Sequence, residues 1–388
     1  MANRTKIWLK NICISCIAVV VFTIILEIII RTTHLFGARI SWVKPDPVTA
    51  YRFTPNATYW YLKENNHPIA GKINKYGWRD RDWSILKPVN TVRIAVLGDS
   101  FVEAFQVESN RTFLALTEMI LNSDKKINYE LMNFGISGVT QTEELIILEN
   151  DVIKFSPDAV ILFFYSNNDI DYIAKTTAAD KNRPFFNISE TGELLLDTTF
   201  HDSKAFKVKE KINWIKQHSI IISLISDRYN AFRAGICFKK NQEKYEMSKK
   251  IIGSLTLCTR NPDERYLKNY ELNKRIIGKI AEFCLSRNIQ FILTTIPIPP
   301  SYVPEEETKY LNRDKGFNSR YFEDDLEKYT ISLHVEYIEL VKPFKKKYDN
   351  EHIFLNGGNC EEWGHWNYYG HELVARVLSE RLKQIFDR

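Results

Sequence analysis

The stretch Val92-Arg93-Ile94-Ala95-Val96-Leu97-Gly98-Asp99-Ser100-Phe101 decides the fold of this chain. Its first six residues are mostly branched and apolar, which predicts a buried β-strand. The strand ends abruptly in Gly-Asp-Ser, where the glycine permits a sharp turn and the aspartate can bond nearby backbone N–H groups. Ser100 is thereby delivered to the carboxyl end of a strand, the edge at which α/β sheets bind their ligands.

A Gly-Asp-Ser tripeptide alone is also typical of a plain strand-to-helix turn in which the serine caps the helix. A catalytic role for Ser100 therefore requires partners from the rest of the chain.

The composition predicts a large core and no nucleic-acid partner. The 388 residues are 44% apolar, enough for one elaborated domain or two. The 53 basic and 48 acidic residues are spread along the chain, without the concentrated basic face of a nucleic-acid binder. Asp169 and Asp171 lack further carboxylates at metal-binding spacing. We therefore expect neither a metal ion nor a cofactor.

The N-terminal segment predicts a membrane anchor. The run from 12 to 30 is interrupted only by Ser15, Thr23 and Glu27, and it is long enough to cross a bilayer as a helix. No small-x-small cleavage site precedes Arg31, which favours an anchor over a cleaved signal peptide.

The orientation of this anchor is predicted from the length of its tail. Basic residues are nearly balanced across the run: Arg4, Lys6 and Lys10 precede it, and Arg31, Arg39 and Lys44 follow it. A short tail before one spanning segment is typical of a signal anchor. We expect a single-pass membrane protein with residues 1–31 as tail and anchor and the remainder outside the cytoplasm, periplasmic or extracellular.

Four cysteines lie beyond the anchor, which itself contains Cys13 and Cys16: Cys237, Cys258, Cys284 and Cys360. None has the close spacing of a zinc site. Disulfides and buried thiols both remain open.

Residues 32–90 are polar and aromatic without a regular period, and we interpret them as a stalk that becomes a wrapping segment. Its aromatic side chains are expected to pack against the domain rather than bind a ligand: Trp42, Tyr51, Phe53, Tyr59, Trp60, Tyr61 and Trp78.

Residues 91–388 predict an α/β domain. Apolar strands are expected at 92–97, 129–134 and 159–165, and helices at 111–122 and 143–155 lie between them. Strands separated by helices indicate a parallel sheet built from right-handed βαβ units.

The alternation stops between 170 and about 268, where no clear strand is present. Helical stretches at 207–214 and 220–232 suggest a helical insertion over the carboxyl edge of the sheet, or a satellite domain. The alternation then resumes with further elements, expected at 270–287, 290–296, 320–329, 335–340 and 368–386.

Three strand ends carry residues useful for acyl transfer: Ser100, Gly138 and Asn168. A backbone N–H at glycine and an asparagine amide can stabilise an oxyanion. His365, just before the last helix, can act as the base, and Glu362 three residues earlier can orient its imidazole.

His371 is the alternative base, but it falls inside the predicted final helix. We expect His371 to face solvent or to support packing.

Four blocks of this sequence, in order, resemble those of SGNH/GDSL-type hydrolases over residues 92 to about 385: Gly98-Asp99-Ser100-Phe101, Asn133-Phe134-Gly135-Ile136-Ser137-Gly138, Asn167-Asn168-Asp169 and Glu362-Trp363-Gly364-His365-Trp366-Asn367. The resemblance implies a flavodoxin-like three-layer α/β/α fold. It also implies a nucleophile at Ser100, a base at His365, and an oxyanion hole made by the N–H groups of Ser100 and Gly138 and the Asn168 side chain.

The chain departs from this pattern at two places. Ser166 and Asn167 stand where the family usually has a glycine near the Asn-Asp pair, and Glu362 stands where an aspartate is usual. A glutamate can also orient the imidazole, so we interpret Glu362 as a change from the usual pattern that keeps the site active.

The predicted function is that of a membrane-anchored serine esterase or O-acyltransferase on acyl esters, with O-acetyl groups of cell-surface glycans as the favoured substrate. The alternative is a non-catalytic scaffold of an envelope or polysaccharide assembly that keeps only the fold. The joint presence of Ser100, Gly138, Asn168 and His365 disfavours the scaffold, which needs none of them. Hydrolysis and transfer differ only in whether water or a sugar hydroxyl takes the acyl group.

Overall fold

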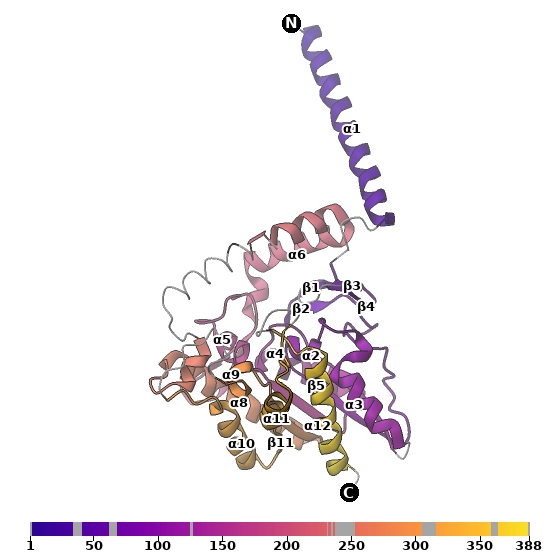
Figure 1. Ribbon diagram of the computed structural model, residues 1–388. Coiled ribbons are helices and arrows are strands. Elements are labelled where there is room, and N and C mark those ends of the chain that lie inside the picture. The colour runs from indigo at the N-terminus through magenta and orange to yellow at the C-terminus, as the bar shows by residue number, and fades with distance from the viewer. Residues whose placement is uncertain are drawn as a thin grey trace.

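A computed structural model describes residues 2–33, 41–61, 68–124, 127–230, 232–233, 236, 253–304, 316–357 and 364–386 (Figure 1). Its centre is a five-stranded sheet in the order β11-β10-β7-β5-β6, with every pair parallel. The strands are β5 (Thr91–Leu97), β6 (Asn128–Asn133), β7 (Ala159–Phe164), β10 (Gln290–Thr295) and β11 (Glu336–Ile338). Numbered along the chain this order is 2-1-3-4-5, the flavodoxin-like arrangement. The predicted fold is confirmed.

Helices cover both faces of the sheet. One face packs against α4 (Gln141–Asn150), α8 (Glu264–Leu285) and α10 (Tyr321–Leu333). The other packs against α3 (Phe113–Leu121), α11 (Val341–Glu351) and α12 (Tyr368–Phe386). Successive strand residues alternate between the two cores: Ala95 and Leu97 face the first, and Ile94 and Val96 the second.

The sequence analysis did not predict α11. Lys345 and Lys346 in this helix are exposed, whereas Val341, Phe344 and Tyr348 recur at helical spacing and are buried. The second predicted helix is also shorter than expected. It ends with α4 at Asn150, and a separate 3-10 turn covers Val152–Phe155.

The segment before β5 forms two small antiparallel sheets, which the sequence analysis did not predict. They consist of β1 (Val43–Asp46) with β2 (Ala50–Phe53), and β3 (Thr58–Tyr61) with β4 (Ile69–Lys72). The expected aromatic packing is present: the ring centroids of Tyr59 and Phe53 lie 4.5 and 5.7 Å from that of Phe105. The buried Arg79 reinforces this packing by donating to the Tyr59 hydroxyl and to the carbonyl oxygens of Glu103 and Val107.

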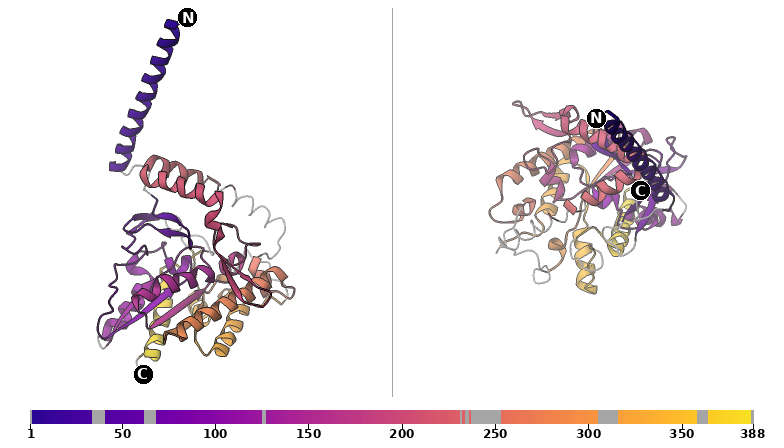
Figure 2. Two further views of the ribbon diagram at one scale, coloured as in Figure 1. Left: turned by 180° about the vertical axis from the view of Figure 1, so that it is seen from behind. Right: turned by 90° about the horizontal axis from the view of Figure 1, so that it is seen from above.

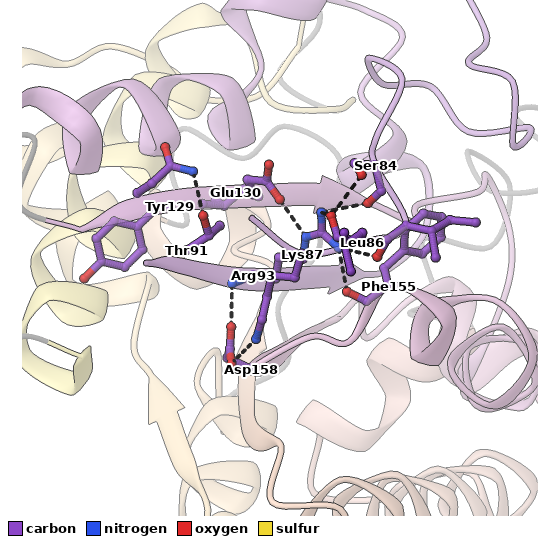
Figure 3. Close-up of polar contacts among 12 residues, drawn as sticks. Ser84, Leu86, Lys87, Thr91, Arg93, Tyr129, Glu130, Phe155 and Asp158 are labelled. Carbon is purple, nitrogen blue, oxygen red and sulfur yellow. Dashed lines mark hydrogen bonds and ion pairs between the residues drawn. The ribbon is translucent and has the colours of Figure 1, made fainter. Parts of the chain in front are cut away.

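Arg93, fully buried in β5, ties the same segment to the sheet (Figure 3). Its Nε donates to Glu130 at 2.6 Å, and its Nη atoms donate to the carbonyl oxygens of Ser84, Ile85 and Phe155 at 2.7 to 3.0 Å. These hydrogen bonds and the ion pair with Glu130 offset the free-energy cost of burying the positively charged guanidinium group.

The region after β7 is not wholly helical, contrary to expectation. It begins with α5 (Asn168–Tyr172), followed by an antiparallel pair, β8 (Phe185–Ile188) and β9 (Leu194–Asp197). The hydrophobic pattern does not predict these strands, because each has only four residues and β9 lacks the alternation of apolar and polar residues. Helices then follow as predicted: α6 (Lys204–His218) and residues 220–230.

The N-terminal helix α1 (Ala2–Thr33) extends away from the rest of the molecule (Figures 1 and 2). In the described part of the chain, it is the one helix long and apolar enough to cross a membrane. Cys258 and Cys284 are buried free thiols, whereas Cys237 and Cys360 lie outside the described residues.

Candidate active site

The predicted turn after β5 is present. Ser100 is the first residue of the short helix α2 (Ser100–Glu103), and the Asp99 side chain caps it by accepting the Phe101 N–H at 2.9 Å. A Cβ at position 98 would lie 2.4 Å from a methyl carbon of Val102, so only glycine fits there. The half-buried Ser100 side chain is thus held at the carboxyl edge of the sheet.

His365 lies next to Ser100. Its Nε2 is 2.6 Å from the Ser100 Oγ, although 265 residues separate the two in sequence. The loop that carries His365 is anchored on both sides: the Gly357 N–H donates to the His365 carbonyl oxygen at 2.8 Å, and Trp366 is fully buried. A serine bonded to an imidazole nitrogen is the arrangement that a nucleophile and its general base require.

Glu362, the predicted orienting carboxylate, falls in 358–363, outside the described residues. Its role stays a prediction.

Of the two predicted oxyanion donors, Asn168 bonds directly to the Ser100 turn, and Gly138 follows Ser137, which contacts α2. Asn168 begins α5, and its Nδ2 donates to Asp99 Oδ2 at 2.5 Å. Gly138 has φ +70°, and a Cβ there would lie 3.5 Å from the Tyr51 hydroxyl oxygen. Its neighbour Ser137 hydrogen-bonds the Glu103 carboxylate, which links this loop to α2.

Two buried carboxyl groups lie under the site. Burial raises the pKa of Asp99 to about 6, opposed by the hydrogen bond from Phe101 and by the attraction of His365. Burial likewise raises the pKa of Glu103 to about 7, against the hydrogen bonds from Ser137. Glu103 Oε2 has no hydrogen-bond partner within the described part of the chain. Both carboxyl groups therefore keep their protons to a higher pH than exposed carboxyl groups do.

Sequence reasoning missed a second buried polar layer beside Asp99. Glu143, fully buried at the start of α4, accepts from Arg183 Nε at 2.7 Å. Asp169 accepts from Gln141 Nε2 at 2.7 Å and from the Tyr165 N–H at 2.8 Å, and burial raises its pKa well above the usual range.

One sequence pattern pointed to this buried polar layer, namely a helix capping box at the start of α4. Thr140 and Glu143 have the S/T-x-x-E spacing, and the Glu143 carboxylate accepts from the Thr140 N–H at 3.1 Å. In a capping box the glutamate carboxylate points back to the first residues of the helix. The first residues of α4 are buried, so the Glu143 carboxylate is buried with them.

His371, the alternative base, is not near solvent. It is fully buried, and its Nδ1 accepts the Phe113 N–H at 3.1 Å. Burial lowers its pKa to about 3, so His371 stays neutral. The expectation of a solvent-facing side chain is wrong, and the alternative of a packing role is correct.

No protein-family model and no curated protein matches the sequence. Similar solved structures include the acetyl xylan esterase AlAXEase, at 13% identity and TM-score 0.40, covering 75% of this chain and 100% of that one. A member of the lipolytic protein G-D-S-L family from Veillonella parvula has 13% identity, TM-score 0.37 and coverages of 76% and 99%. The lipase/acylhydrolase from Enterococcus faecalis has 12% identity, TM-score 0.38 and coverages of 76% and 96%.

Proposed function

We propose that this chain is a serine hydrolase of acyl esters, with Ser100 as the nucleophile and His365 as the general base. The observation that carries the proposal is the 2.6 Å contact between Ser100 Oγ and His365 Nε2. As Oγ bonds to the ester carbonyl carbon, Nε2 takes the serine proton. The imidazolium then gives that proton to the leaving alkoxide as the ester C–O bond breaks. An acyl-serine and a free alcohol result.

The second half of the reaction decides between hydrolysis and transfer. His365 takes a proton from the incoming hydroxyl, whose oxygen attacks the acyl-serine, and then returns the proton to Ser100. Water as the acceptor releases a carboxylic acid, and a sugar hydroxyl gives a new ester.

The oxyanion of each tetrahedral intermediate needs donors. We assign this role to the backbone N–H groups of Ser100 and Gly138 and to the Asn168 side chain. Asn168 Nδ2 carries two hydrogens, and its bond to Asp99 uses one of them. The second hydrogen can serve the oxyanion.

The proposed setting is a membrane surface outside the cytoplasm, with α1 as the anchor and O-acetyl groups of cell-surface glycans as the substrate class. The apolar α1 and the aromatic-rich segment behind it support this setting. Protease added to spheroplasts should digest the C-terminal domain. Protection of that domain beside an intact cytoplasmic control would overturn the topology.

The full-length protein in detergent tests the chemistry. It should hydrolyse a chromogenic acetyl ester and react with a fluorophosphonate, with the adduct mapped to Ser100 by mass spectrometry. Ser100→Ala should lose both signals at an unchanged melting temperature, because loss of a half-buried hydroxyl opens no core cavity. Turnover retained in pure Ser100→Ala would remove Ser100 from the mechanism. Wild-type protein with neither turnover nor adduct would favour the scaffold.

A further inference from the structure

We propose that a helical hairpin, made of α6 and residues 220–230 with Phe232 as its continuation, lies on the surface of the bilayer that α1 spans. Its outer apolar side chains would enter the headgroup region. This inference rests on the membrane anchor of the proposed function and is independent of the ester chemistry.

The turn of the hairpin is bonded to the end of α1. Glu27 accepts the N–H of Ile220 at 2.7 Å and of Ile221 at 3.2 Å, and also the Ser219 hydroxyl at 3.0 Å. A side chain of α1 thus caps the second helix of the hairpin. Arg31 adds a bond to the carbonyl oxygen of His218 at 3.1 Å. The hairpin is therefore held at the last turns of the candidate span.

Apolar contacts reinforce this junction. Ile30 of α1 and Ile220 are both buried and pack with three partly buried neighbours, Leu26, Ile221 and Leu224. The hairpin lies across the end of α1, between that helix and the rest of the molecule (Figures 1 and 2). This is the arrangement expected of a helix that lies parallel to the membrane plane beside the end of a transmembrane helix.

The inner side of the hairpin is fixed to the domain. Phe206 of α6 is buried with Phe200 and Ala50, and Gln217 Nε2 donates to Thr54 Oγ1 at 3.2 Å. An ion pair of 3.2 Å between Lys216 and Asp227 joins the two helices. These contacts determine which sides of the helices face outward.

The outer side carries two apolar stripes at helical spacing. They are Val208, Ile212 and Ile215 on α6, and Ile222, Ile225, Tyr229 and Phe232 on the second helix, each 40% to 67% exposed. Apolar side chains in such a row are unfavourable in water, at about 25 cal/mol for each Å² exposed. An apolar stripe beside a basic polar face is the signature of a helix lying in a membrane interface.

Charge favours lipid as the partner. The α6 sequence contains five lysines and one glutamate. A hollow of about 470 Å³ between β1 and α6 is lined by Trp214 and by more basic than acidic side chains, with Lys44 and Lys211 against Glu210. Lysine side chains attract lipid phosphates, and tryptophan prefers the headgroup level. A protein partner would explain the exposed apolar stripes, but it would not explain why they lie next to the last turns of a candidate membrane-spanning helix.

This placement also orients the candidate active site. β1 contacts α6 and pairs with β2, whose Tyr51 hydroxyl faces Gly138. The C-terminus lies at the end of the molecule opposite α1 (Figure 1). The carboxyl edge of the sheet is therefore on the membrane side, within reach of esters presented at the bilayer surface.

Photocrosslinking of the full-length protein tests the inference. The photoreactive residue p-benzoylphenylalanine is placed singly at Ile212, at Ile225, at Ile14 in α1, and at Ile331 on α10. Each protein is reconstituted in nanodiscs of phosphatidylglycerol and phosphatidylcholine, irradiated, and examined for phospholipid adducts by mass spectrometry. Ile331 is the matched control, because it is 69% exposed but lies on a helix far from α1. We expect lipid adducts at positions 14, 212 and 225 in large excess over position 331.

The controls separate the two proposals. Adducts at position 14 without adducts at 212 and 225 would overturn the inference and leave the anchor standing. Crosslinks at 225 to a second copy of the chain would also overturn it, in favour of a protein interface. No adduct at position 14 would refute the anchor and the inference together. Ester turnover, measured on the same samples, reports on the catalytic proposal alone.

Discussion

Asn168 donates its side-chain amide to Asp99 Oδ2 at 2.5 Å, which joins the carboxyl ends of β7 and β5 directly beside Ser100. The other Asp99 oxygen accepts the Phe101 N–H. One buried carboxyl group therefore shapes the nucleophile turn and also orients an amide proposed for the oxyanion hole. This link holds Asn168 beside the Ser100 turn.

Asn168→Ala should lower kcat by about 10² to 10³ with little change in KM, because an oxyanion donor acts mainly in the transition state. Steady-state kinetics on the acetyl ester measures the effect. Asn167→Ala is the matched control, since the adjacent amide contacts Tyr165 and Ser254 instead. Equal losses in the two variants would contradict the assignment.

Glu362→Gln tests the carboxylate that is expected to orient His365. If Glu362 orients His365, the change should reduce turnover by up to ~10⁴, as measured for the corresponding change in a serine protease. His365→Ala should reduce turnover at least as much. The double variant should resemble His365→Ala alone, because a deleted base cannot be misoriented. Additive losses, or a Glu362→Gln enzyme within a few-fold of wild type, would indicate a Ser-His dyad.

Glu103→Gln should change how stability depends on pH. Burial raises the pKa of Glu103 from 4.5 to about 7, so the folded state holds its proton more tightly than the unfolded state. Wild-type protein therefore loses stability as the pH rises from 4.5 to 7, by about 3 kcal/mol from this group. The glutamine variant lacks this loss, so its stability relative to wild type should increase across the same range.

Urea unfolding at pH 5 and pH 8 measures the difference. Glu380→Gln, at an exposed position on α12, controls for the loss of a carboxylate in general. A Glu103→Gln difference that is the same at both pH values would show that the buried carboxyl is not perturbed.

Arg93→Met should destabilise the fold by about 3–5 kcal/mol, because it leaves Glu130 and four carbonyl oxygens without this donor. Arg81→Met is the control. Arg81 is 47% exposed in its ion pair with Glu118, and its loss should change stability by less than about 1 kcal/mol. Similar unfolding midpoints for the two variants would refute a structural role for the Arg93 network.

Much of the sheet could be predicted from local pattern. Apolar runs located β5, β6, β7 and β10 to within a residue or two, and the final helix was predicted at the residues where α12 is found. Parallel strands place their carboxyl ends at one edge of the sheet, so the sequence predicts that Ser100 and Asn168 lie close together. His365 was expected there from its residue type and its place before the last helix.

The sequence by itself determined these elements because hydrophobic periodicity is a local property of the chain. Only the tertiary structure decided which polar side chains are buried. Glu143 is buried because Arg183, forty residues later, comes to meet it, and His371 is buried because Phe113 covers it from a distant helix. The apolar face of α6 is presented outward because Phe206 and Gln217 hold its other face to the domain. Burial depends on what distant segments bring to a site, and no local pattern encodes that.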